Sequence, residues 1–105
     1  MLFRSAQGLQ RVLPYAEEKD ITLNMELLNS KVDHFNYVAD HFDWGFTLAE
    51  FINSPRFKLL FDIYHMQIME GDLIRNIRRG IHRIGHFHTA GHPGRHDIKI
   101  GRAHV

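Results

Sequence analysis

Two carboxylates and an imidazole end three separate apolar runs of this sequence, and together they have the chemistry of a divalent metal site. Asp62 ends a fully apolar run, Glu26 ends an alternating run, and His88 ends a third, short run. Carboxylate oxygens and imidazole nitrogens suit Mg²⁺, Mn²⁺ or Zn²⁺ better than a soft metal. Taken singly, an aspartate after a strand often only caps the next helix, and a histidine in an apolar strand is more often structural. The prediction of a metal site therefore depends on the three residues together.

Apolar spacing predicts the elements of the first half of the chain. Residues 2–16 carry apolar side chains three and four positions apart, which predicts a helix that Pro14 should kink or end. Residues 21–27 alternate apolar with polar, which predicts a strand with Glu26 on its polar face. Residues 29–43 are polar and aromatic, and we expect a long loop with a short helical stretch. A loop of that length is itself a hint of function.

The second half of the chain repeats the order of helix and strand. Residues 46–52 have helical spacing, and the next apolar run ends at Asp62. A helical stripe follows over residues 73–84, with Asp72 as its expected amino-terminal cap, and residues 85–90 form a third short strand. Strands that alternate with helices require right-handed crossovers and a parallel sheet, so we expect an α/β fold. The carboxyl ends of such strands share one rim, where ligands bind.

Composition limits the class of protein. With 105 residues, 44% of them hydrophobic, the chain can form one modest core. The net charge of +1 is small, and the clustered arginines 75, 78, 79 and 83 lie on a predicted helix surface, so we expect no nucleic-acid partner. The absence of cysteine excludes disulfides and thiolate ligands. No apolar run approaches the ~18 residues of a membrane span, and no signal-peptide core is present, so we expect a cytoplasmic protein without a membrane partner.

Three sequence segments resemble one known family. LNMELLN, KLLFDIYHMQIMEGDLIR and IGHFHTAGHPGRHD are similar to the hydroxypyruvate isomerase branch of the sugar phosphate isomerase/epimerase family, and the likeness runs over about residues 9–97. That family has a xylose isomerase-like barrel fold. A complete (β/α)₈ barrel has eight strands and ~250 residues, so the resemblance implies a partial TIM barrel with about three parallel strands.

The resemblance also assigns roles at the metal site. It implies that Glu26 is both a metal ligand and one of two acid/base carboxylates, and that Asp62 and His88 are metal ligands. His88 stands where some relatives have glutamine, a change that keeps a ligand and could alter the preferred metal. Mg²⁺ or Mn²⁺ is the expected cofactor, with Zn²⁺ as the alternative.

Three further residues are assigned to the substrate by the same resemblance. His65 and Arg95 are expected to face substrate oxygens, and Asn29 is a weaker member of this group. Without the family, His65 could merely cap a helix and Arg95 could be an exposed loop residue. The implied substrate is a small hydroxy keto acid or sugar, isomerised between aldehyde and ketone through an enediolate. An oligomer of the full-length parent is compatible with the resemblance.

The end of the sequence departs from the family pattern. We expect residues 1–99 to be a fragment of the barrel domain and residues 100–105 to be a non-native tail that resembles a translated adapter. The family places its second catalytic glutamate on a later strand, so we expect this chain to be inactive by itself. Asp97 stands where relatives often carry glutamate and receives no role.

Two other functions stay open. The same barrel superfamily includes endonuclease IV-like DNA repair enzymes, whose several metals are bound by many histidines and carboxylates, and this chain has nine histidines. Such an enzyme should show a broader basic stripe. The other alternative is a non-catalytic fragment or interaction module, whose open sheet edges need a partner to cover them.

Overall fold

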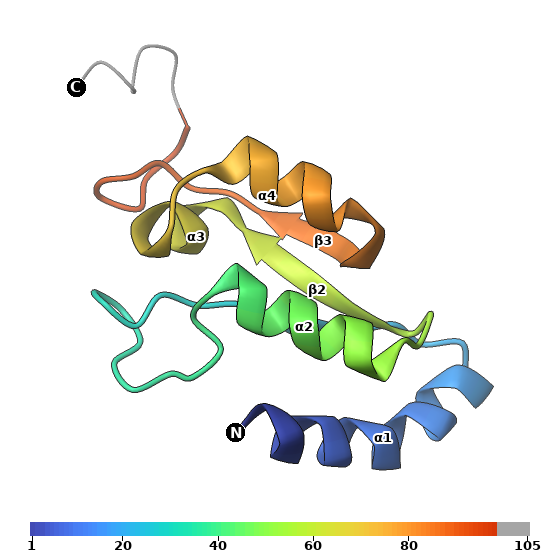
Figure 1. Cartoon of the computed structure of the whole chain (residues 1–105). Coiled ribbons are helices and arrows are strands. Elements are labelled where there is room, and N and C mark those ends of the chain that lie inside the picture. The colour runs from blue at the N-terminus through green and yellow to red at the C-terminus, as the bar shows by residue number, and fades with distance from the viewer. Residues whose placement is uncertain (99–105) are drawn as a thin grey trace.

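Helices alternate with strands in the computed structural model of this chain, which describes residues 1–98 (Figure 1). The elements are α1 (Leu2–Glu18), β1 (Leu23–Glu26), α2 (Phe42–Ile52), β2 (Phe57–Asp62), α3 (Ile63–Met69), α4 (Leu73–Gly80), the 3₁₀ helix η1 (Ile81–Arg83) and β3 (Ile84–His88). Their order confirms the predicted α/β fold class. Two α-helices, α3 and α4, and the 3₁₀ helix η1 separate β2 from β3 along the chain.

The three strands form one parallel sheet in the order β1, β2, β3. Glu26 lies opposite Leu60, and Asp62 lies opposite His88. Because all three strands run in the same direction, their carboxyl ends lie along one edge of the sheet. Within residues 1–98 the sheet is open and does not close on itself, which confirms the prediction of a partial barrel.

One face of the sheet is apolar and packs against helices. Phe57, Leu59 and Phe61 alternate along β2, and each is at most 1% exposed. They belong to the same core cluster as Phe42 and Leu48 of α2, and in Figure 1 that helix runs alongside β2. Burying each such side chain contributes ~1.5–3 kcal/mol. The other residues of β2 face the opposite side of the sheet, where the candidate site lies.

Helix α1 continues past its proline. Pro14 lies inside α1, which ends only at Glu18, so Pro14 does not end the helix. The buried residues Ala6, Leu13 and Ala16 lie on both sides of Pro14, and their packing compensates for the lost backbone hydrogen bond. No helix within residues 1–98 is long and apolar enough to span a bilayer. The tail expected over residues 100–105 lies outside the described residues.

The long loop after β1 has turns where a short helical stretch was expected. The Asn29 side-chain oxygen accepts hydrogen bonds from the backbone N–H groups of Val32, at 2.9 Å, and Asp33, at 3.0 Å. An asparagine that binds nearby backbone groups in this way offers the chain a turn instead of a helix. The expectation of a helical stretch in this loop was therefore wrong.

The segment before β3 differs from its predicted helical stripe. α4 ends at Gly80, and Ile84 begins β3 instead of continuing the helix. Asp72 precedes α4, but its backbone is left-handed, with φ of 46°, and its side chain makes no capping hydrogen bond. The Asp72 carboxylate instead lies 3.4 Å from Nε of Arg75. Asp72 therefore stands at the predicted amino-terminal cap position of α4, but its side chain does not cap the helix.

Candidate metal and substrate site

The three predicted metal ligands meet at the carboxyl-terminal edge of the sheet. His88 Nδ1 lies 3.5 Å from Glu26 Oε2 and 3.9 Å from Asp62 Oδ2. Glu26 and Asp62 also each offer a carboxylate oxygen, and these two oxygens lie within 4.8 Å of each other. The parallel register produces this meeting, because Glu26, Asp62 and His88 are the last residues of β1, β2 and β3.

Asp62 uses its two carboxylate oxygens differently. Oδ1 accepts backbone hydrogen bonds from Tyr64, at 2.9 Å, and His65, at 3.3 Å, and so caps α3. Oδ2 lies toward the imidazoles of His65 and His88. Asp62 is therefore both a helix cap and a member of the polar cluster, and the two interpretations of this residue do not compete.

Glu26 is held in an environment that favours its protonated form. Partial burial raises the pKa of Glu26 above its ordinary value, and the hydrogen bond and negative charge of Asp62 raise it further. His88 opposes this shift only in part. Two carboxylates whose oxygens lie within 4.8 Å repel each other when both are ionised. A proton on one of them, or a cation between them, relieves this repulsion.

The donor set fits a hard divalent cation. Ligand atoms of such ions lie ~2.0–2.3 Å from the metal, so two ligand atoms of one ion lie at most ~4.6 Å apart. The separations of 3.5 and 3.9 Å from His88 Nδ1 to the two carboxylates meet that requirement. Two carboxylates and one imidazole suit Mg²⁺, Mn²⁺ or Zn²⁺. A cation here would also remove the repulsion between the two carboxylates.

His65 approaches the same carboxylates from α3. Its side chain is fully buried, and Nε2 lies 3.9 Å from Glu26 Oε2 and 3.8 Å from Asp62 Oδ2. Glu26, Asp62 and His65 each offer a ligand atom, and these atoms all lie within 4.8 Å of one another. Distance alone would therefore admit His65 as a ligand beside or instead of His88.

The protonation of His65 argues against that role. Nδ1 of His65 accepts the backbone N–H of Asn29 at 3.1 Å and lies 2.7 Å from the side-chain nitrogen of the same residue. Burial lowers the pKa of His65 and favours the neutral ring, in spite of nearby Asp62. A neutral ring that accepts at Nδ1 carries its hydrogen on Nε2, which then has no lone pair for a metal. Nε2 makes no protein hydrogen bond and is a donor aimed at the site.

Asn29 acts on His65 from the loop after β1. Its side chain is completely buried, its oxygen accepts two backbone N–H groups, and its nitrogen donates to Asp33 at 2.7 Å. The polar atoms of this amide are thus engaged within the protein. The predicted contact between Asn29 and a substrate stays a prediction, whereas its contact with His65 is present in the structure.

Arg95 lies at the border of the site, in the loop after β3. Its side chain is 48% exposed, and one guanidinium nitrogen lies 3.8 Å from Asp33 Oδ1. The guanidinium carbon lies 4.9 Å from the centre of the Tyr64 ring, which is cation–π distance. Arg95 is therefore close to the neighbours of His65, as its predicted role requires, and its charge remains open to solvent.

Two residues that sequence reasoning missed connect these groups. Asp33 accepts the hydroxyl hydrogen bond of Tyr64 at 2.8 Å and the side-chain hydrogen bond of Asn29. Neither has a distinctive sequence signal: Asp33 is one of several acidic residues of the loop, and Tyr64 is one more aromatic residue beside His65. Their contacts arise only when the loop after β1 packs against α3.

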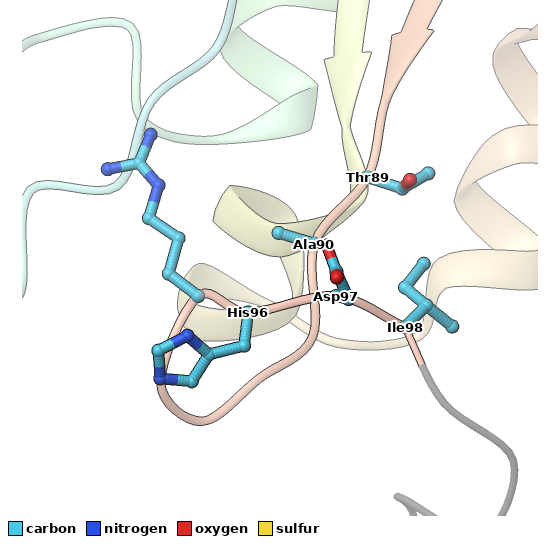
Figure 2. Close-up of a pocket in the computed structure, with 6 residues that line it drawn as sticks. Thr89, Ala90, His96, Asp97 and Ile98 are labelled. Atoms are coloured by element: carbon cyan, nitrogen blue, oxygen red, sulfur yellow. The ribbon is translucent and has the colours of Figure 1, made fainter.

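A hollow of about 690 Å³ lies beside the cluster and not over it. It is lined by Thr89, Ala90, Arg95, His96, Asp97 and Ile98, and Figure 2 shows these residues along the loop that follows β3. Arg95 is the predicted site residue in this lining. The converging carboxylates and imidazoles, and not the size of this hollow, identify the candidate site. Asp97 lines the hollow and still receives no role.

The clustered arginines are largely engaged with acidic side chains. Arg79 pairs with Asp43, Arg83 pairs with Glu50 at 2.9 Å, and Arg75 pairs with Asp72. A nucleic-acid surface needs arginines that are available to phosphates. These pairs favour the interpretation of the arginines as an ordinary charged surface.

Comparison with known proteins places these observations in a family. A family described as xylose isomerase-like TIM barrel matches residues 2–105. The 2-oxo-tetronate isomerase of Cupriavidus necator is 34% identical over 82% of this chain and 33% of its own length. The hydroxypyruvate isomerase of Escherichia coli K12 is 30% identical over 85% of this chain and 36% of its own length. The chain thus spans about a third of the curated relatives it matches.

A solved structure agrees with these sequence relatives. A crystal structure of D-psicose 3-epimerase in the presence of D-fructose superposes with a TM-score of 0.77 and 25% identity. The likeness covers 96% of this chain and 35% of the epimerase chain. The relatives are isomerases and epimerases, and the likeness to hydroxypyruvate isomerase expected from the three sequence segments is confirmed.

Proposed function

Because this chain belongs to the xylose isomerase-like TIM barrel family, we propose that its site serves a metal-dependent isomerase of a small hydroxy keto acid or sugar. The reaction interconverts an aldehyde and a ketone on neighbouring carbons. The observation that carries the proposal is the meeting of Glu26, Asp62 and His88 at the ends of three adjacent strands. The names of the isomerase relatives support the reaction class.

Glu26 is the proposed base. Isomerisation requires removal of a proton from the carbon next to a carbonyl, and the resulting enediolate carries negative charge shared by two oxygens. A carboxylate is a better base when its pKa is raised toward the working pH, and partial burial raises the pKa of Glu26. Glu26 then holds the proton that must be returned to the neighbouring carbon or passed to a second acid.

The metal ion is proposed to be held by Glu26, Asp62 and His88. Their two carboxylates and one imidazole suit Mg²⁺ or Mn²⁺, with Zn²⁺ as the alternative. When bound, such an ion supplies positive charge that stabilises developing negative charge on substrate oxygens. Asp62 also keeps the amino terminus of α3 in place by its second oxygen, so it orients His65 as well.

His65 and Arg95 are proposed to bind the substrate in different ways. The buried Nε2–H group of His65 points toward the carboxylate cluster and can donate one hydrogen bond to a substrate oxygen. Arg95 keeps its positive charge at all relevant pH values and is half exposed, which suits a carboxylate or hydroxyl at the outer end of a small substrate. Asn29 contributes by holding the His65 ring.

A chimera tests this proposal within a complete enzyme. Residues 9–97 would replace the matching segment of the E. coli hydroxypyruvate isomerase, and the chimera would be incubated with hydroxypyruvate and Mn²⁺ in deuterated water. We expect enzyme-dependent deuterium on the carbon next to the carbonyl. Glu26→Gln should lower the labelling rate by ~10²–10⁴-fold, the usual contribution of an acid/base group.

The control is Glu50→Gln, which changes an exposed glutamate of α2 that pairs with His82 and Arg83 far from the cluster. It should leave the labelling rate unchanged. A folded chimera that binds Mn²⁺ but produces no label, or a Glu26→Gln variant as active as the unchanged chimera, would overturn the proposal.

The cytoplasmic location, the oligomer of a longer parent and the endonuclease alternative stay predictions. Cleavage of a DNA duplex that contains an abasic site would test the endonuclease alternative.

A further inference from the structure

Segments that follow all three strands meet at one carboxylate, that of Asp33. Asp33 itself belongs to the loop after β1. Tyr64, which follows β2, donates its hydroxyl to Asp33 Oδ2 at 2.8 Å. Arg95, which follows β3, lies 3.8 Å from Asp33 Oδ1. One side chain thus joins groups that follow three different strands.

Asp33 is also linked to the buried ring of His65 by a continuous chain of contacts. The Asn29 side-chain nitrogen donates to Asp33 Oδ2 at 2.7 Å and lies 2.7 Å from His65 Nδ1. In the other direction, the backbone N–H of Asp33 donates to the Asn29 side-chain oxygen at 3.0 Å. The amide of Asn29 is therefore clamped by Asp33 at both of its polar atoms.

This clamp favours the tautomer of His65 that carries its hydrogen on Nε2. The Asn29 backbone N–H and side-chain NH₂ both present hydrogens to Nδ1, so Nδ1 accepts and Nε2 carries the hydrogen. Without the Asp33 carboxylate, the Asn29 NH₂ group loses its acceptor at Oδ2 and is held less firmly against Nδ1, so the preference for the Nε2–H tautomer weakens. The hydrogen bonds from Asn29 and Tyr64 hold the pKa of Asp33 below its ordinary value, so the clamp stays ionised at neutral pH.

We propose that Asp33 is a positioning residue of the isomerase site, which holds Arg95 and Tyr64 in place and, through Asn29, keeps the hydrogen of His65 on Nε2. The inference rests on the proposed function only in giving His65 and Arg95 their substrate roles. Asp33 itself supplies neither a metal ligand nor a base. Its carboxylate prepares two substrate-binding groups before the substrate arrives.

Nitrogen-15 NMR of histidine in the 105-residue chain tests the clamp without any need for activity. In the unchanged chain, the His65 spectrum should show a protonated Nε2 and an unprotonated Nδ1. Asp33→Ala should shift both nitrogen signals toward the values of a tautomer mixture. The matched control is Asp43→Ala, which removes an exposed aspartate of α2 that pairs with Arg79. This variant should leave the His65 signals unchanged.

Two milder variants keep the test decisive if Asp33→Ala does not fold. Tyr64→Phe removes one partner of Asp33 and retains the ring, and Asp33→Asn retains an acceptor without the charge. Asp33→Asn should shift the His65 signals partway, whereas Tyr64→Phe should shift them less. Unchanged His65 signals in folded Asp33→Ala, or in folded Asp33→Asn where Asp33→Ala is unfolded, would overturn the proposal.

The chimera separates this inference from the proposed function. There, Asp33→Ala should lower kcat/KM by ~10–100-fold, the usual cost of losing a supporting partner, and leave the affinity for Mn²⁺ unchanged. A chimera without isomerase activity would refute the proposed function, and the tautomer measured in the 105-residue chain would still decide the role of Asp33. An unchanged kcat/KM in Asp33→Ala would show that the clamp is structural only.

Discussion

At the scale of single residues, Asp62 divides its two oxygens between the stability of α3 and the polar cluster. Asp62→Ala removes the acceptor for the N–H groups of Tyr64 and His65, and Asp62→Asn keeps one in the same place. We therefore expect Asp62→Ala to lower the free energy of unfolding by ~0.5–2 kcal/mol relative to Asp62→Asn, the usual value of a helix cap. Urea unfolding followed by circular dichroism would measure the difference.

The same pair of variants separates the cap from the charge. Asp62→Asn removes the negative charge that faces Glu26, so we expect the pKa of Glu26 to fall and the variant to be no less stable than the unchanged chain. Equal loss of stability in both variants would show that the charge, and not the cap, is what Asp62 contributes to the fold.

Asp33 gives a prediction about pH. Hydrogen bonds from Asn29 and Tyr64 lower the pKa of Asp33 below ~3.9, its value in an unfolded chain. A group with a lowered folded pKa stabilises the protein above the unfolded pKa, and this stabilisation is lost as pH falls through the folded pKa. We expect a carbon-13 titration to give Asp33 a pKa below ~3.9, and Tyr64→Phe to raise it. A pKa that Tyr64→Phe does not change would contradict the hydrogen bond.

The sequence could predict the metal cluster because its members need only parallel strands to meet. Glu26, Asp62 and His88 end consecutive strands, and a parallel sheet places such residues side by side whatever the loops do. The contacts of Asp33 and Tyr64 depend on the conformation of loops, and no periodic pattern specifies them. Residue patterns therefore predicted the ligands but missed the residues that orient His65.

At the scale of elements, the junction between α2 and α4 tolerates no added atom. A Cβ at Gly80 would lie 2.3 Å from Cζ of Phe42, whose ring is fully buried and cannot move aside. We expect Gly80→Ala to lower the free energy of unfolding by ~1–3 kcal/mol through overpacking. The control is Gly8→Ala in α1, where nothing lies within 4 Å. Gly8→Ala should raise stability by ~0.5–1 kcal/mol because alanine favours a helix.

Thermal unfolding of the two glycine variants would measure these opposite signs. A Gly80→Ala variant as stable as the unchanged chain would mean that α4 can move away from α2 without loss of stability.

The predicted end of the helix was wrong near the same residue, since Ile84 continued the helical spacing of α4 but pairs in β3. The helical pattern could not reveal that the backbone turns at Gly80, because periodicity records side-chain faces and not the direction of the chain.

At the scale of the whole molecule, the openness of the sheet limits how well the site can hold a metal. The side chain of His88 is 49% exposed and that of Glu26 is 31% exposed, so neither is fixed by packing on all sides. Metal affinity depends on the order of the ligands. We expect calorimetry to show weak Mn²⁺ binding to the 105-residue chain, weaker still in Glu26→Gln. Tight binding would contradict this prediction, since it would mean that three strands suffice to order the ligands.

The order β1, β2, β3 is the same along the chain as across the sheet. Each pairing of neighbouring strands therefore closes only the stretch of chain between them, and the entropy lost in closing such a stretch is modest. Glu26, Asp62 and His88 consequently come together as soon as these three strands pair, so the assembly of the chemical centre needs only the pairing of strands that follow one another along the chain.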